Sequence, residues 1–248
     1  MFSESDGYER FMGRWSRRLA PLFVTFAGVT QGDRVLDVGS GTGALSAAAA
    51  AVDSVRVTGI EPSPAFVRYA QQHVGGRFDV GDALALPFPD DAFDRTLSLL
   101  VLNFVPDPAA ALQQMVRVTR PGGVVAAAVW DYGDGMQMLR RFWDAAVALD
   151  PDAEPRDERH MPVCTRAALG ELWRAHGLRD VDEQPLTIEM AFAAFDDYWQ
   201  PFQCGQGPAG AYVSSLSESA RDALESKLRA DGDLKLRARA WAVRGVVT

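Results

Sequence analysis

The sequence contains few of the residues that build disulfide frameworks and metal sites. Among its 248 residues there are two cysteines, Cys164 and Cys204, and three histidines. Two cysteines without a CxxC pair are typical of a reducing compartment rather than of a disulfide framework. Three scattered histidines do not supply the ligand set of a zinc site. We therefore expect no metal ion and a protein of the cytoplasm.

Long apolar runs are missing as well, and so is an excess of positive charge. No uncharged apolar run is long enough to span a bilayer, and the polar, acidic N-terminus has no apolar signal core. Acidic residues number 33 and basic residues 25, so the net charge is −8. Nucleic-acid binders carry larger basic clusters than the one formed by Arg14, Arg17 and Arg18. We expect neither a membrane nor a nucleic acid as partner, and either a monomer or a homodimer.

Apolar residues are abundant and follow a repeating order. They make up 48% of the chain, which is enough to bury the core of one domain. Short β-type runs alternate with helical stretches up to residue 130, and this alternation predicts a parallel sheet with helices on both faces. Ligands of such sheets bind at the carboxyl ends of the strands. We expect strands at residues 34–38, 55–60, 77–80, 93–99 and 124–130, a turn at 120–123, and helices at 44–51, 64–73 and 108–119.

The pattern changes after residue 130, where longer additions begin. Additions at strand ends usually shape a substrate pocket. We expect a helix at residues 136–149, a surface loop at 150–162, a helix at 165–175, a strand at 181–192, helices through 195–229 and a last strand at 236–247. Seven aromatic side chains here suit either core packing or contact with a small apolar acceptor: Trp130, Tyr132, Phe142, Trp143, Tyr198, Trp199 and Phe202.

The strongest chemical signal is a glycine-rich turn after the first expected strand. Asp37 lies in that strand, and the turn runs Gly39-Ser40-Gly41-Thr42-Gly43. Glycines let the backbone approach a ligand with no Cβ in the way. The spacing GxGxG differs from the GxGxxG of dinucleotide folds. A carboxylate at this strand end suits a positively charged amino acid better than a pyrophosphate.

Two further acidic residues follow the next two strands. Glu61, in Gly59-Ile60-Glu61-Pro62-Ser63, is placed to accept from both hydroxyls of a ribose. Asp82, in Gly81-Asp82-Ala83, is placed to accept from an adenine amino group. A solvent-facing glutamate and a turn aspartate are the plain alternatives. The pair favours an adenosine ligand without choosing among the cofactors that contain one.

With residues 98–107 and Arg120-Pro121-Gly122-Gly123, these signals resemble class I methyltransferases related to the menaquinone and ubiquinone biosynthesis enzymes. The resemblance covers about residues 30–130, and segments 8–15 and 238–245 resemble a less characterised bacterial subgroup. It implies S-adenosylmethionine as cofactor and a Rossmann-like, seven-stranded, mostly parallel sheet with an antiparallel last strand and helices on both faces. It also implies one domain, 1–248, with a helical cap at 1–30, a cofactor-binding core at 31–130 and lid insertions at 131–163 and 194–230.

The resemblance also assigns residues to the cofactor. Asp37, Gly39 and Gly41 would hold its amino-acid end, and Glu61 would hold the ribose in place of the family's usual Asp. The remaining assignments are Pro62 and Phe66 beside the adenine, Asp82 and Ala83 at the adenine edge, and the carbonyl of Leu99 near the methionine portion.

The sequence identifies no catalytic base. Methyl transfer from a sulfonium is an in-line displacement, to which a protein contributes mainly proximity and alignment. A base is needed only for an uncharged hydroxyl or a carbon acid. Many relatives carry a histidine where this chain has Asn103, and His73, His160 and His176 suit surface or capping positions better.

A small-molecule methyl acceptor is the favoured interpretation, and three alternatives stay open. A nicotinamide-dependent oxidoreductase is disfavoured by the GxGxG spacing. A macromolecule methyltransferase, acting on protein or RNA, is disfavoured by the acidic charge. The loop Asn103-Phe104-Val105-Pro106 also lacks the [DN]PP[YF] pattern of adenine amino-methylation. A non-catalytic relative that binds the cofactor is the third.

The N-terminal segment combines aromatic and cationic side chains. Tyr8, Phe11 and Trp15 lie close together in the sequence, which indicates docking onto the sheet or closure over the strand ends. In the second case Arg14 would grip the cofactor carboxylate, because a guanidinium can form two parallel hydrogen bonds to a carboxylate.

Overall fold

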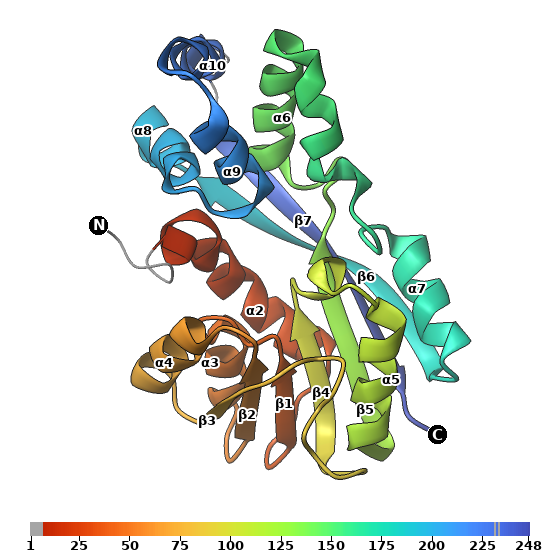
Figure 1. The fold of residues 1–248 in the computed structure, drawn as a ribbon. Coiled ribbons are helices and arrows are strands. Elements are labelled where there is room, and N and C mark those ends of the chain that lie inside the picture. The colour runs from red at the N-terminus through yellow and green to blue at the C-terminus, as the bar shows by residue number, and fades with distance from the viewer. Residues whose placement is uncertain (1–6, 231, 233) are drawn as a thin grey trace.

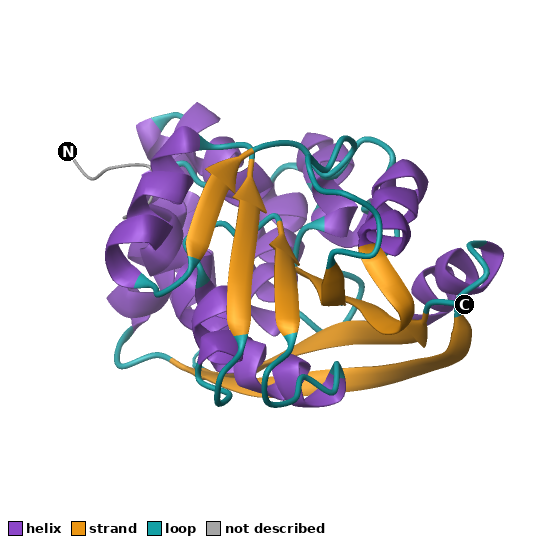
Figure 2. Ribbon diagram, turned by 90° about the horizontal axis from the view of Figure 1, so that it is seen from below, coloured by secondary structure: helices purple, strands orange, loops and turns teal. Residues whose placement is uncertain are grey.

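The computed structural model describes residues 7–230, 232 and 234–248, so the first six residues of the expected cap lie outside it. The described residues form a seven-stranded sheet in the order β3-β2-β1-β4-β5-β7-β6. Helices cover both faces of this sheet (Figure 1, Figure 2). The strands are β1 Arg34–Val38, β2 Arg56–Glu61, β3 Arg77–Val80, β4 Phe93–Leu99, β5 Thr119–Trp130, β6 Arg179–Ala191 and β7 Lys235–Val246.

The helices follow the strands in the expected alternation. A short π-helical turn, Glu9–Gly13, leads into α2, and short 3₁₀ turns cover Leu102–Phe104, Pro151–Arg156, Glu158–His160 and Gln200–Cys204. The α-helices are α2 Arg14–Phe26, α3 Ala44–Ala50, α4 Pro64–His73, α5 Pro108–Val118, α6 Gln137–Leu149, α7 Arg166–Ala175, α8 Phe195–Trp199, α9 Gly207–Ser215 and α10 Glu218–Ala230.

The expected fold class is confirmed. Strands β1 to β5 pair in parallel, and β7 pairs antiparallel with both β5 and β6. In the described chain β7 is therefore the one strand that runs against the others. Ser63 caps α4 by accepting from the N–H of Phe66, with Pro64 at the first helical position, as its sequence predicts.

Two expectations were wrong. The segment 120–123 is not a turn between elements, because β5 already begins at Thr119 and absorbs the glycines through a register shift against β4 between Phe93 and Arg95. The segment 150–162 is not a surface loop throughout. Asp157 and Glu158 are each only 4% exposed, because Asp157 is drawn inward by the guanidinium of Arg140 on α6.

The additions share a core with the N-terminal segment. In Figure 1, α6, α8, α9 and α10 gather at one end of the molecule. The rings of Phe142 and Phe202 stack with centroids 4.5 Å apart, and Phe11 meets Phe202 edge-on at 5.2 Å. The seven aromatic residues singled out from the sequence are all buried, so core packing is confirmed for them. Two of them, Trp130 and Tyr132, also line a cavity described below.

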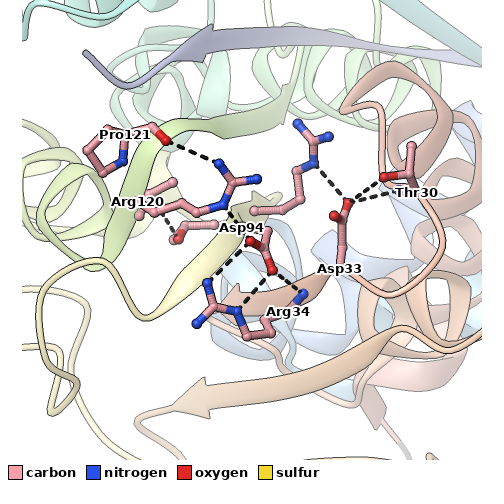
Figure 3. A network of polar contacts seen from close by, with 9 residues as sticks. Thr30, Asp33, Arg34, Asp94, Arg120 and Pro121 are labelled. Atoms are coloured by element: carbon pink, nitrogen blue, oxygen red, sulfur yellow. Dashed lines mark hydrogen bonds and ion pairs between the residues drawn. The ribbon is translucent and has the colours of Figure 1, made fainter.

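An ion-pair network joins the amino ends of the central strands (Figure 3). Asp94 at the start of β4 accepts from Arg34 of β1 at 3.0 Å and from Arg120 of β5 at 2.6 Å. The hydrogen bond from Arg34 is the main reason that the pKa of Asp94 lies well below its usual range. Beside it, Arg95 donates to Asp33 at 3.0 Å. This network braces the sheet at the edge opposite the glycine-rich turn.

The buried ion pair between Arg140 and Asp157 gives a stability prediction. The two side chains are 10% and 0% exposed, so removing the carboxylate leaves an unpaired buried cation. We expect Asp157→Ala to lower the free energy of unfolding by about 3–5 kcal/mol, measured by urea denaturation. The control is Asp144→Ala, because the pair between Asp144 and Arg159 is exposed and such pairs contribute at most about 1 kcal/mol. Equal losses in the two variants would contradict the assignment.

Candidate active site

The carboxyl ends of three adjacent strands meet at one cavity. The parallel register sets Asp37 of β1 beside Leu97 of β4, and Val38 of β1 beside Ile60 of β2. The last residues of β2 and β4, Glu61 and Leu99, therefore reach the same edge of the sheet. A cavity of about 310 Å³ opens there, which we call the first cavity. Of the residues expected to bind the cofactor it contains Asp37, Gly39, Gly41, Glu61, Pro62, Phe66 and Leu99.

The glycines of the turn have the conformation that the sequence predicts. Gly39 has φ +74°, and a Cβ added there would lie 2.5 Å from a methyl carbon of Val101. Its N–H donates to the carbonyl of Ile60 at 2.8 Å, which fastens the turn to β2. Gly41 has φ +52°, and among the described atoms none lies within 4 Å of a Cβ added to it. At Gly39 and Gly41 the turn thus presents bare backbone to the first cavity.

Asp37 is a buried carboxylate with a single side-chain donor among the hydrogen bonds of the described residues. It is 1% exposed, and the hydroxyl of Ser46 donates to it at 2.6 Å. Burial raises its pKa to about 7, although the hydrogen bonds from Ser46 act in the opposite direction. A positive charge brought into the first cavity would relieve this desolvation. The site therefore favours a cationic ligand group beside Asp37.

Glu61 joins the turn to the start of α4. One carboxylate oxygen accepts from the N–H of Gly41 and the other from the N–H of Ser63, both at 3.0 Å. The side chain is held in place by backbone donors and is 8% exposed at the cavity wall. A carboxylate oxygen can accept more than one hydrogen bond.

The N-terminal segment lines the first cavity with two residues that the sequence did not assign to the cofactor. Tyr8 and Ser16 line it, with their side-chain oxygens 3.4 Å apart. The ring of Tyr8 lies 5.5 Å from that of Phe66. The hydroxyl of Ser40 is buried and, within the described chain, has no hydrogen-bond partner. The spacing of Tyr8 before α2 indicates docking but does not reveal which side chain faces the cavity.

Three of the predicted cofactor residues do not line this cavity. Arg14 donates to Asp197 at 2.6 Å and lies over the rings of Trp15 and Phe192, beside a separate hollow. This partner engages the guanidinium, so the structure does not bring Arg14 to the strand ends. Asp82 and its neighbour Ala83 follow β3; the exposed Asp82 carboxylate accepts from the N–H of Leu84 at 2.9 Å.

A second cavity of about 100 Å³ adjoins the first. The two share Tyr8, Leu100 and Phe104 as lining residues. Phe104 is 55% exposed, which is unusual for a phenylalanine and places an open aromatic face at the junction. The second cavity is walled by aromatic and aliphatic side chains, with one carboxylate among its described lining residues, that of Glu158.

Sequence reasoning missed Glu158 because the surrounding segment is polar. The indole N–H of Trp143 donates to its carboxylate. Burial raises the pKa of Glu158 to about 7 despite this donor. The available signal was Trp143 itself, because a tryptophan on the apolar face of a helix needs an acceptor for its N–H when it is buried.

The histidines keep to surface and capping positions, as expected. His160 is exposed and lies 3.0 Å from Glu154, while His73 and His176 bond to backbone carbonyls four residues earlier. Across the described residues no group of three or more metal-ligating side chains gathers. The helices in the described part of the chain are all too short or too polar to cross a membrane.

Comparison with known proteins agrees with this geometry. Residues 36–127 match the model of a methyltransferase domain. The chain is 38% identical over 200 residues to a 2-methyl-6-phytyl-1,4-hydroquinone methyltransferase of Synechocystis, covering 77% of this chain and 61% of the relative. It is 33% identical to the 27-O-demethylrifamycin SV methyltransferase of Amycolatopsis mediterranei, covering 75% and 65%. The chain thus spans less than two thirds of either relative.

A solved structure extends the likeness to nearly the whole fold. A putative methyltransferase from an antibiotic biosynthesis pathway of Anabaena variabilis superposes with a TM-score of 0.66 at 17% identity, covering 91% of this chain and 96% of that one. The residues matched by the domain model include the glycine-rich turn, Glu61 and Asp82. The strand order and the cavity at the strand ends agree with such a domain. The chain belongs to the class I S-adenosylmethionine-dependent methyltransferases.

Proposed function

We propose that this chain transfers a methyl group from S-adenosylmethionine to a small-molecule acceptor. The observation that carries the proposal is the first cavity, where a desolvated carboxylate, a glycine-rich turn and a second carboxylate converge. Because the chain spans less than two thirds of these relatives, methyl transfer by this chain is itself part of the proposal.

The residues of the first cavity fit the cofactor group by group. Its ammonium would relieve the burial of Asp37, and its carboxylate would come within reach of the unpartnered hydroxyl of Ser40 and the backbone of Gly41. Backbone donors hold Glu61 at the end of β2, next to the strand that carries Asp37. There it would accept hydrogen bonds from the ribose hydroxyls. Pro62 and Phe66 give the adenine two apolar walls.

The remaining predicted contacts stay predictions. Asp82 and Ala83 follow β3, which pairs with β2 through Glu61 and Val80, so the adenine edge would face them at the same side of the sheet. Leu99 ends β4 at the cavity wall. We do not assign Arg14 to the cofactor carboxylate, because Asp197 already holds its guanidinium.

The second cavity supports a small acceptor. Its volume of about 100 Å³ is smaller than the apolar cavity of about 150 Å³ that binds benzene, so a single ring held there would extend towards the first cavity. It joins the first cavity through Tyr8, Leu100 and Phe104, so an acceptor there would meet the methyl group without crossing solvent. Both named curated relatives act on small molecules by their names. The segments 131–163 and 194–230 would then serve as the lid, and 1–30 as the cap, of the core at 31–130.

Cofactor binding tests this proposal. We expect calorimetry to show binding of S-adenosylmethionine and of its demethylated product, and none of NAD. Glu61→Ala should weaken binding by roughly 1–3 kcal/mol, because hydrogen bonds to the ligand are lost. Glu154→Ala is the control, since Glu154 is exposed and pairs only with His160 among its described contacts. Binding of NAD instead of S-adenosylmethionine would overturn the proposal, and unchanged affinity in a folded Glu61→Ala variant would remove the ribose assignment.

The pKa of Asp37 gives a second test. Its carboxylate is half protonated near pH 7 in the free protein, and a bound ammonium favours the ionised form. Below pH 7, binding must then release a proton, so affinity should fall about tenfold per pH unit towards pH 5.5 and level off above pH 7.5. Calorimetry at pH 6 in two buffers of different ionisation enthalpy measures the released proton directly.

The control for this pH dependence is Asp37→Asn, in which the proton release at pH 6 should vanish. Tyr8 also faces the first cavity, but the burial of its hydroxyl raises its pKa above 10, so it stays protonated in this range. A proton release that persists in Asp37→Asn would assign the titration to another group.

A further inference from the structure

We propose that the second cavity binds an uncharged ring hydroxyl, a phenol or an enol, and that the carboxylate of Glu158 is the general base that takes its proton. This inference rests on the proposed methyl transfer and names the acceptor class and the base for it. It fills the gap left by Asn103, which stands where many relatives carry a histidine.

The walls of the second cavity select a ring. Phe11, Phe104, Trp130 and Tyr132 present aromatic surface to it, and Leu139 adds an aliphatic side. Stacked or edge-on rings gain more from such walls than flexible aliphatic chains do. The cavity of about 100 Å³ is too small for more than part of a larger molecule. A ring seated in it would extend past the shared residues Tyr8, Leu100 and Phe104 towards the first cavity.

Glu158 is fixed at this wall by its neighbours. The guanidinium of Arg140 grips Asp157 with contacts of 2.7 and 2.8 Å, and that grip holds the next residue, Glu158, inside. Trp143 then orients the carboxylate through its indole N–H. A general base has to lie within hydrogen-bond reach of the proton before its basicity contributes to the reaction.

The charges around Glu158 favour an uncharged acceptor over an ammonium. The nearby cations Arg140 and Arg159 are both paired with Asp157, and Asp144 is paired with Arg159. Apart from Glu158 itself, these described groups leave no unpaired negative charge to hold a cation. Glu158 itself exchanges a proton near neutrality. An amine would enter as an ammonium without a lone pair, whereas a hydroxyl enters neutral and loses its proton as it reacts.

The proposed step is balanced in atoms and charge. The oxygen of the acceptor hydroxyl forms the new O–CH₃ bond, and its proton passes to the carboxylate of Glu158. The C–S bond of the sulfonium breaks, with its electron pair going to sulfur. A positive sulfonium, a negative carboxylate and a neutral hydroxyl become a neutral thioether, a neutral carboxylic acid and a methyl ether.

The buried phenol and thiol groups near Glu158 stay protonated between pH 5.5 and 8. Burial raises the pKa of Tyr132 well above 10 and that of Cys164 to about 12, and Tyr8 also stays protonated. The imidazole of His160 lies exposed on the same turn. Experiments on Glu158 are therefore designed in a His160→Gln background.

The first experiment needs neither cofactor nor turnover. Proton–nitrogen NMR resolves the indole N–H of the six tryptophans, and Trp143→Phe identifies the one bonded to Glu158. We expect this signal to titrate with a midpoint near pH 7 and to stop titrating in Glu158→Gln. The indole of Trp173, which donates to the carbonyl of Val125 at 3.0 Å, is the internal control and should not move. A flat Trp143 signal, or one that still titrates in Glu158→Gln, would overturn the assignment of the base.

The second experiment tests the acceptor with a labelled methyl donor and a panel of single-ring phenols, enols and amines. We expect transfer to hydroxyl acceptors, and a loss of about 10²–10⁴-fold in kcat in Glu158→Gln, with cofactor affinity unchanged. In Glu158→Ala, added formate should restore part of kcat, which a purely structural role would not allow. Glu154→Gln, an exposed change on the same segment, should keep full activity.

The outcomes separate this inference from the proposed function. If S-adenosylmethionine does not bind, the proposed function fails. If it binds and only amines or no hydroxyls are methylated, the acceptor class is wrong. If hydroxyls are methylated equally well by Glu158→Gln, or formate restores nothing in a folded Glu158→Ala, Glu158 is not the base.

Discussion

The parallel register of β1, β2 and β4 is the constraint on which both cavities depend. Because these strands are hydrogen-bonded in parallel, their carboxyl ends finish at one edge, and the last residues of each face the same space. A shift of one residue would turn Asp37 and Glu61 to the other side of their strands. The ion pairs of Asp94 with Arg34 and Arg120 act at the far edge, where they favour the register without occupying the site.

A second interaction decides what lies above that edge. Taken alone, burying the pair of Arg140 and Asp157 costs free energy, because both groups lose their hydration. Its structural effect is to fold a polar segment inward over α6, so that Glu158 becomes part of a cavity wall. The sheet thus supplies two carboxylates, Asp37 and Glu61, by strand geometry, while the addition supplies a third, Glu158, through a side-chain ion pair of its neighbour. The two cavities differ in origin although they share Tyr8, Leu100 and Phe104.

The difference in origin explains what could be predicted from the sequence. The strands, the glycine-rich turn and the place of Glu61 follow from local spacing, since a strand end, a turn and a helix start lie within a few residues of one another. The partner of Arg14 is 183 residues away, and no local pattern encodes such a pairing. Charge density made 150–162 look solvated, because a sequence does not reveal that Arg140 offsets the charge of Asp157.

Burial raises the pKa of one carboxylate in each cavity. Asp37 and Glu158 both have pKa values near 7, so each cavity holds one poorly solvated group. The ammonium of the cofactor would stabilise the ionised form of Asp37. After transfer the sulfonium charge is gone, and the proton taken from the acceptor sits where burial favours it, on a neutral Glu158. In the proposed role, Glu158 is ionised before transfer and neutral once the product has formed. The same desolvation that makes Glu158 costly in the fold thus drives the proton in the direction the reaction needs.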